Sequence, residues 1–246
     1  MTKYIADRFI DEFNKQGIAV DCFRIETVDM QNITYFCYDA LGIFYPVHAL
    51  NAPEIVIKSA KLLPKSDGKN TFIIHTAGED NKVNYASSDL LIKLLTGKGY
   101  NVFYNRLIEM PSNLIVKYDE AKVAGILSAA NEDIPNIAGE IIKLTPYFMK
   151  ESVFAKVLAF AGRAEWLGAR ILGKFFYIKS GCTRCGKCAD NCPNRNIVMN
   201  EKSVSFMRRC GLCMRCIYLC PQNAVYIRRP FRFLRFEQWY DCEMFK

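Results

Sequence analysis

The chain has 246 residues, about half of them apolar, with a net charge of +8 and eleven cysteines. This length suits one large or two modest domains, and the apolar fraction is enough to bury a core. The N-terminus carries charges throughout, and no run of about 18 uncharged apolar residues occurs, which excludes a signal peptide and a membrane span. Eight of the cysteines fall between Cys182 and Cys220. We therefore expect a cytoplasmic protein whose clustered thiols bind metal, and not a secreted disulfide scaffold.

Residues 1–144 alternate between helical and strand patterns and form the first expected domain. Residues 3–16 place apolar side chains on one helical face that ends at Gly17, and the residues on this face are Ile5, Phe9, Ile10 and Phe13. Further helices are expected from Pro53 to about Leu63, at 85–98 and at 118–144, the last interrupted by Pro135. Strands are expected at 19–25, 41–47, 71–78 and 100–108. Such alternation predicts an α/β fold with a parallel sheet covered by helices.

Residues 145–178 read as a helical connector with apolar and basic character. Charged side chains interrupt any membrane span here, and they are Lys156, Arg163, Glu165, Arg170 and Lys174. We expect this connector to pack between the two domains. Contact with a membrane surface is the less favoured alternative, because basic amphipathic helices serve both purposes.

An internal repeat follows the connector. The run CTRCGKCADNCP begins at Cys182 and CGLCMRCIYLCP begins at Cys210, so each copy reads C-x-x-C-x-x-C-x-x-x-C-P. Each copy leads into a short strand-like run, at 197–199 and at 225–227. Two copies of one unit predict a small α+β domain, at 179–230, with pseudo-two-fold symmetry.

The cysteine spacing predicts two [4Fe–4S] clusters. In this pattern the first three cysteines hold one cluster and the fourth reaches the other cluster. One predicted ligand set is therefore Cys182, Cys185, Cys188 and Cys220, and the other is Cys210, Cys213, Cys216 and Cys192. Zinc is a poor alternative, because zinc sites pair C-x-x-C knuckles and close with four ligands. Cys22, Cys37 and Cys242 lie outside the pattern. Cys22 is expected to be a small buried apolar residue on a strand, and Cys37 and Cys242 are expected to be incidental thiols.

Residues 176–230 resemble the bacterial-type two-[4Fe–4S] ferredoxins. The resemblance implies a compact fold, fast electron exchange between the clusters, and low reduction potentials. Basic residues near the ligands should raise those potentials, namely Arg184, Lys187, Arg208, Arg209 and Arg215.

The net charge supports the same interpretation. Residues 1–178 contain 20 basic and 20 acidic residues, whereas 179–246 contain 13 basic and 5 acidic residues. Eight thiolates and two oxidised cluster cores would reduce the charge of this part to about +4. Much of the basic excess therefore offsets the negative charge of the clusters, and we expect no nucleic-acid partner. In the tail at 231–246, Arg alternates with Phe; packing on the ferredoxin domain is favoured there over docking of an acidic redox partner.

The N-terminal domain resembles flavodoxins in three runs, LGIFYPVHALNAP (41–53), FIIHTAGED (72–80) and MPSN (110–113). Together with a C-terminal ferredoxin, these runs are similar to the EFR1-type ferredoxins of anaerobic bacteria. The resemblance implies an FMN site with contacts from Pro46, Val47, His48, Thr76, Ala77, Gly78 and Glu79. Thr2 matches the last residue of the phosphate loop, while the first strand and the rest of that loop are missing. We hypothesise a misassigned start codon or a truncated gene. The alternative for His48 and for His75 is an ordinary histidine at a strand end.

The sequence thus predicts an electron-transfer protein with two [4Fe–4S] clusters that exchanges electrons with a redox protein partner and with a flavin if one is bound. One alternative is an FMN-dependent oxidoreductase that uses the clusters as an internal electron wire. Another is a partner-docking module with a non-functional flavin domain. No catalytic triad or Cys–His pair is recognisable.

Overall fold

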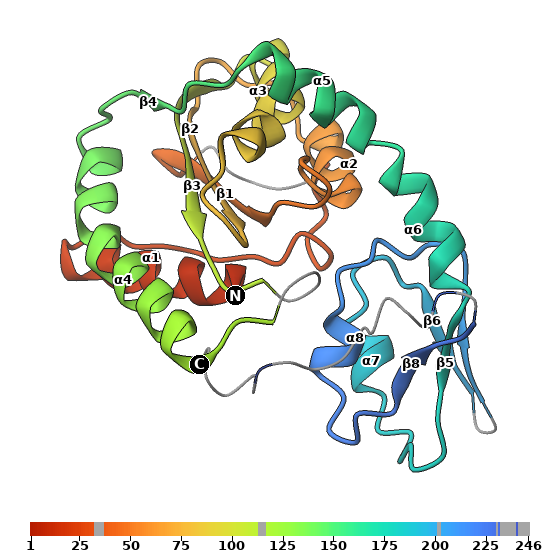
Figure 1. The fold of residues 1–246 in the computed structure, drawn as a ribbon. Helices are drawn as coiled ribbons and strands as arrows, with labels where there is room; N and C mark the ends of the chain where they lie inside the picture. The colour runs from red at the N-terminus through yellow and green to blue at the C-terminus, as the bar shows by residue number, and fades with distance from the viewer. Residues whose placement is uncertain (32–36, 113–116, 201–202, 230, 232–239, 241–246) are drawn as a thin grey trace. The chain divides into compact units, whose positions relative to one another are not determined.

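The computed structural model describes residues 1–31, 37–112, 117–200, 203–229, 231 and 240 (Figure 1). The chain divides into two compact units, Met1–Ser112 with Tyr118–Arg163, and Asn113–Lys117 with Ala164–Lys246. No helix within the described ranges is long and apolar enough to cross a membrane.

Unit 1 is an α/β domain built on a parallel sheet. Its elements are α1 (Thr2–Lys15), β1 (Ala40–Pro46), α2 (Glu54–Leu62), β2 (Asn70–Ala77), the 3-10 helix η1 (Lys82–Ser88), α3 (Asp89–Gly97), β3 (Asn101–Glu109), α4 (Glu120–Ile142), β4 (Tyr147–Phe148) and α5 (Val153–Gly162). The sheet order is β1-β2-β3-β4, and all neighbouring strands are parallel. Helices α1 and α4 lie on one face of the sheet, and α2 and α3 lie on the other (Figure 1). This confirms the predicted α/β class.

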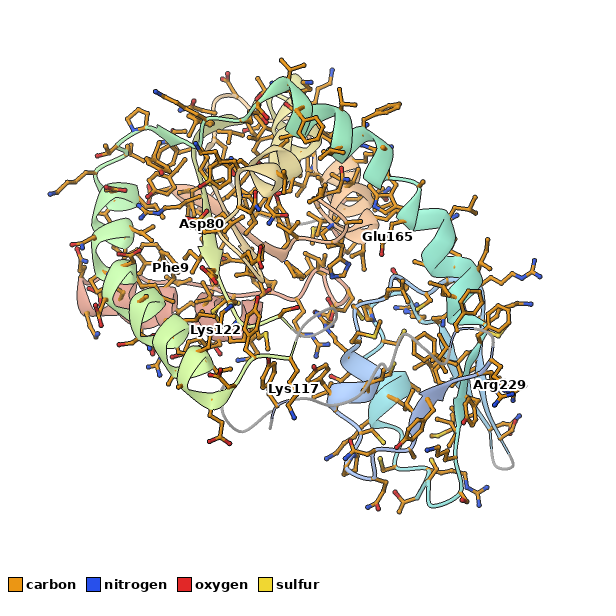
Figure 2. The ribbon with its side chains drawn as sticks, in the orientation of Figure 1. Phe9, Asp80, Lys117, Lys122, Glu165 and Arg229 are labelled. Carbon is orange, nitrogen blue, oxygen red and sulfur yellow. The ribbon has the colours of Figure 1, made fainter. Side chains whose placement is uncertain are left out.

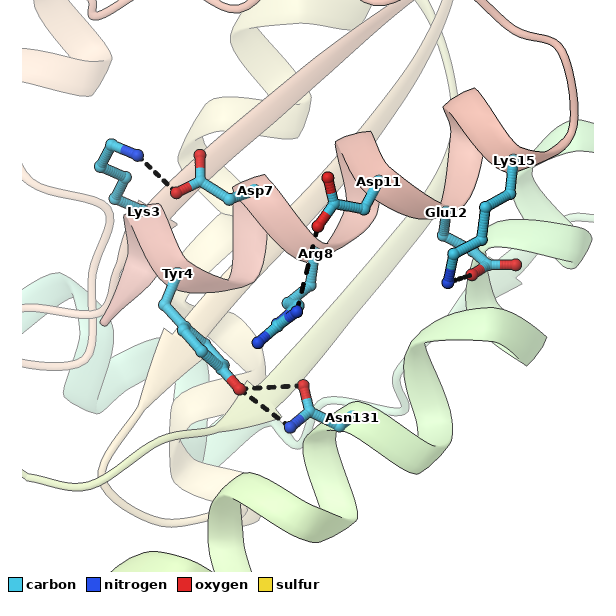
Figure 3. Close-up of polar contacts among 8 residues, drawn as sticks. All are labelled: Lys3, Tyr4, Asp7, Arg8, Asp11, Glu12, Lys15 and Asn131. Carbon is cyan, nitrogen blue, oxygen red and sulfur yellow. Dashed lines mark hydrogen bonds and ion pairs between the residues drawn. The ribbon is translucent and has the colours of Figure 1, made fainter. Parts of the chain in front are cut away.

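Helix α1 packs through aromatic side chains. Its buried residues are Tyr4, Ile5, Phe9 and Phe13. Phe9, labelled in Figure 2, contacts Phe44 of β1 with ring centroids 5.5 Å apart, and Phe13 contacts Phe72 of β2 at 6.0 Å. Tyr4 Oη also bonds the side-chain amide of Asn131 on α4, at 3.1 Å from Oδ1 and 2.8 Å from Nδ2 (Figure 3). The apolar face expected from the sequence therefore holds α1 on the sheet and beside α4.

Two expectations for unit 1 are wrong. Residues 19–25 form no strand, although they read as one. An extended segment needs a neighbour for its N–H and C=O groups, and β1 pairs only with β2 among the described residues. Pro135 does not interrupt α4, which runs through it. Pro135 is exposed, while Ile134 and Ile137 on either side are buried, so their packing compensates for one lost backbone hydrogen bond.

Unit 2 is a small α+β domain in which one set of elements occurs twice. Its elements are α6 (Glu165–Gly173), β5 (Phe176–Ile178), α7 (Lys187–Asp190), β6 (Ile197–Met199), β7 (Val204–Phe206), α8 (Arg215–Tyr218) and β8 (Val225–Ile227). The elements β5, α7 and β6 recur as β7, α8 and β8, with the same spacing that separates Cys182 from Cys210. Strand β5 pairs with β8 and β6 pairs with β7, both antiparallel. Each two-stranded sheet thus joins the two copies, as the predicted pseudo-symmetry requires.

Candidate metal centre

Both cysteine loops use the same unusual backbone conformation. Positive φ angles occur at three pairs of equivalent positions in the two copies: Arg184 and Leu212, Gly186 and Met214, and Arg195 and Asn223. Five of these six residues carry a side chain, for which this region costs roughly 1–2 kcal/mol per residue. Strain repeated at equivalent positions indicates that the loop shape serves a purpose.

The strained positions aim backbone N–H groups at cysteine sulfurs. The N–H of Arg184 lies 3.4 Å from Cys182 Sγ, and the N–H of Leu212 lies 3.4 Å from Cys210 Sγ. At the other end of each copy, Asn196 N–H donates to Cys192 Sγ at 3.1 Å. Ala224 N–H donates to Cys220 Sγ at 3.2 Å. Donors of this kind stabilise thiolate sulfur, and hydrogen bonds to the ligands of an iron–sulfur cluster also raise its reduction potential.

The eight repeat cysteines line two separate cavities. The first is partly open to solvent, and its cysteines are Cys182, Cys185, Cys188 and Cys220. The second is similar, and its cysteines are Cys192, Cys210, Cys213 and Cys216. Three cysteines of each cavity come from one copy of the repeat and the fourth comes from the other copy. The cavities thus group the cysteines as the two predicted ligand sets do.

This donor set suits a cluster better than a single ion. Within the part of the chain that the structure describes, no three Cys, His, Asp or Glu side chains are placed to hold one metal ion. A four-iron cube binds four thiolates at its corners and so spaces the sulfurs more widely than one zinc ion does. Four soft sulfur donors around a hollow therefore fit a [4Fe–4S] cluster.

Burial controls the charge of these thiols when no metal is bound. Desolvation raises the pKa of Cys210 to about 12, and it raises the pKa of Cys188, Cys213 and Cys216 as well. These thiols are therefore neutral near pH 7 without metal, and binding of a cluster must release protons.

Two positions near the cysteines escaped the sequence interpretation. Asn196 is buried, and besides its N–H bond to Cys192 its Oδ1 accepts a 2.6 Å hydrogen bond from Arg209 N–H. Gly173 ends α6, and a Cβ there would lie 2.2 Å from Cys210 Cβ. Aligning the two copies on their cysteines places Asn196 opposite Ala224, and this difference between the copies could have singled out Asn196. Nothing in the sequence indicates that Gly173 lies against a cysteine.

The residues predicted to contact FMN gather at the carboxyl end of the sheet in unit 1. Thr2 Oγ1 lies 2.8 Å from Thr76 Oγ1, and Val47 N–H donates to the Thr76 carbonyl at 2.7 Å. Pro46 ends β1, and Ala77 ends β2. His48 forms a bridge with Asn51 in the loop after β1.

The loop after β2 completes this group. Gly78 accepts a 2.6 Å hydrogen bond from Tyr118 Oη, and Glu79 follows it with an exposed side chain. His75, by contrast, is fully buried and 2.7 Å from Ser87 Oγ, and burial lowers its pKa to about 3. His75 therefore belongs to the core.

Cys22 and Cys37 are exposed free thiols in unit 1. The expected burial of Cys22 is wrong, because the segment at 19–25 forms no strand that could cover it. Cys242 and most of the basic and aromatic tail lie outside the described residues.

Residues 174–221 match the family model described as a 4Fe-4S dicluster domain. Comparison with curated proteins and with solved structures finds no match. The family match confirms the predicted ferredoxin-like iron–sulfur segment and supports an electron-transfer role for it.

Proposed function

We propose that the protein carries electrons through two [4Fe–4S] clusters. Cys182, Cys185, Cys188 and Cys220 hold one cluster, and Cys210, Cys213, Cys216 and Cys192 hold the other. The observation that carries this proposal is the pair of cavities, each lined by three cysteines of one repeat copy and one cysteine of the other. Each cluster takes up one electron at a time, and the N–H donors at the sulfurs stabilise the added charge.

Iron and sulfide analysis of protein purified without oxygen tests this proposal. Two clusters require about eight irons and about eight sulfides per chain. A content of about four irons or fewer, with all eight cysteines intact, would contradict it. A redox protein of the cytoplasm is the proposed partner.

As a second candidate function we propose that the carboxyl end of the unit 1 sheet binds FMN, as in the EFR1-type ferredoxins with their flavodoxin-like domain. Ligands of open parallel sheets bind outside this end of the strands. The supporting observation is the meeting of Thr2, Thr76 and the loop at Val47 at one place, although they come from distant parts of the chain. A flavin gathers two electrons while each cluster handles one, so the two groups would complement each other.

A flavin assay distinguishes the candidates. Purified protein that contains FMN, or binds added FMN, supports flavin exchange, and turnover of a small substrate would then indicate a flavin-dependent oxidoreductase. In that case a Thr76→Val substitution should weaken FMN binding without changing the iron content. Intact clusters, no FMN binding and a stable complex with another protein would instead indicate a docking module.

A further inference from the structure

Helices α5 and α6 carry most of their large apolar side chains on the outside. Six of them are between 54% and 78% exposed: Val153, Phe154, Val157 and Phe160 on α5, and Leu167 and Ile171 on α6. Helices of water-soluble domains place such side chains in the core. The fully buried residues of both helices are small instead, which reverses the usual pattern.

Helix α5 shows how this reversal is built into unit 1. Ala155 and Ala159 are buried and pack with Ala86 and Leu50. Asn51 Nδ2 donates to the Ala159 carbonyl at 2.5 Å, and a Cβ at Gly162 would lie 2.1 Å from the Ala49 carbonyl oxygen. The backbone of α5 therefore lies too close to its neighbours for large side chains on that face. The large apolar side chains of α5 lie on the opposite, exposed face of the helix.

Helix α6 repeats the arrangement in unit 2. Ala169 and Gly173 are buried, and Gly173 lies against Cys210, whereas Leu167 and Ile171 are exposed. Helix α6 thus shares the exposed apolar residues and the small buried ones with α5, although its Leu172 packs on the core of unit 2.

Basic residues flank the exposed apolar side chains. Lys156, Arg163 and Arg170 recur at a heptad spacing, and each follows an exposed apolar residue by three positions. Lys174 adds a fourth positive charge, and Glu165 is the single acidic residue between 152 and 174. The Arg163 guanidinium lies 5.4 Å from the centre of the Phe160 ring. A positive charge beside an apolar face is the pattern of helices that lie in the plane of an anionic membrane surface.

We propose that α5 and α6 attach the protein to an anionic phospholipid membrane. The apolar side chains enter the boundary between headgroups and acyl chains, and the basic side chains reach lipid phosphates. A second copy of this face is a worse occupant, because it would bring basic side chains against basic side chains. A bilayer needs no matching shape, so each helix can meet it independently. The sequence alone favoured packing of the connector between the two domains, with a membrane surface as the alternative, and the proposal adopts that alternative.

Sedimentation of the full chain with vesicles tests the proposal. Vesicles of phosphatidylcholine with phosphatidylglycerol should bind the protein, vesicles of phosphatidylcholine alone should bind it less, and added salt should weaken binding. The double variant F154S/F160S should lose about tenfold or more in vesicle affinity, because it removes the two aromatic rings of the apolar face. Phe23→Ser is the matched control, since Phe23 is an exposed aromatic residue elsewhere in unit 1. This variant should bind vesicles as the unchanged protein does.

A charge variant separates lipid binding from a folding defect. K156Q/K174Q alters exposed side chains, although Lys156 also pairs with Glu151 at 2.8 Å, and should lose about tenfold of the preference for phosphatidylglycerol. Unchanged circular dichroism and an unchanged unfolding temperature verify folding of every variant, because cluster absorption reports only on unit 2. The proposal is overturned if the unchanged protein ignores phosphatidylglycerol vesicles, or if F154S/F160S binds them as well as Phe23→Ser. A dimer that F154S/F160S separates, with no vesicle binding, would overturn it too and assign the face to self-association.

Discussion

The two cysteine loops of unit 2 have the same backbone but different surroundings. In the first loop, at 182–188, Arg184 and Cys185 are exposed. In the second loop, at 210–216, the residue equivalent to Arg184 is Leu212, which is buried in a core cluster with Ala169, Phe176, Met214, Ile217, Val225 and Ile227. Burial raises the pKa of all three loop cysteines in the second copy.

This difference separates two roles that residues play around a cluster. The positive φ angles and the N–H donors recur in both copies, so they belong to holding a cluster. The side chains between the cysteines differ, so they would determine how much water and charge reach each of the two proposed clusters. One repeat can therefore build two clusters with the same ligands and different reduction potentials.

The largest expected effect comes from removing ligands in pairs. Cys192→Ala combined with Cys210→Ala removes two ligands of one proposed set, so about four irons should remain. Cys192→Ala combined with Cys182→Ala removes one ligand from each set, so both clusters should be damaged and less iron should remain. Iron and sulfide analysis measures the difference. If the four cysteines of each copy held one cluster, the result would be reversed. The variant without Cys192 and Cys182 would keep about four irons, and the variant without Cys192 and Cys210 would keep fewer.

A change in packing around one loop should be nearly as severe. Gly173→Ala puts a Cβ 2.2 Å from Cys210 Cβ, so the second loop must shift. Such overpacking costs about 1–3 kcal/mol or more, and the iron content should fall towards about four. Gly168→Ala on the same helix meets no atom within 4 Å and should keep all the iron. Equal iron in both variants would show that Gly173 is not needed for the second cluster.

The sequence predicted the cluster unit well because the chemistry there is local. The spacing of Cys182 and its partners restricts the backbone, and strands β6 and β8 have the bounds that the sequence predicted. Strand β5 was missed and read as part of the connector, because its partner strand, β8, lies far along the chain. The close approach of Gly173 to Cys210 was invisible for the same reason.

Unit 1 shows where sequence reasoning fails for a sheet. The segment at 19–25 has the composition of a strand, but strand formation needs a neighbour and not only a suitable sequence. The expected helix at 85–98 is divided between η1 and α3, with Ser88 at the boundary. The meeting of Thr2 with Thr76 was expected only from a family resemblance, because 74 residues separate them.

A smaller effect is expected where the copies differ by one buried side chain. Asn196→Ala gives the first copy the residue that the second copy has at Ala224. The N–H of Arg209 then loses its acceptor, which costs about 1–3 kcal/mol. The visible cluster absorption should disappear at a lower temperature on heating. Ser205→Ala on the exposed part of β7 is the control and should leave that temperature unchanged. If Asn196→Ala and Ser205→Ala lowered this temperature equally, the Asn196 side chain would have no specific role in stability.

The smallest expected effect tests the difference in charge between the loops. Arg184→Leu gives the first loop the residue of the second loop and removes a positive charge beside Cys182 and Cys185. The reduction potential of the first cluster should fall by only about 10 mV, because Arg184 is exposed and solvent screens its charge. A redox titration followed by paramagnetic resonance measures this shift, which added salt should reduce. Arg229→Leu removes an exposed charge outside both loops and should shift the potential less. A larger shift for Arg229→Leu would mean that the overall charge of the unit, and not the loop residues, sets the difference between the clusters.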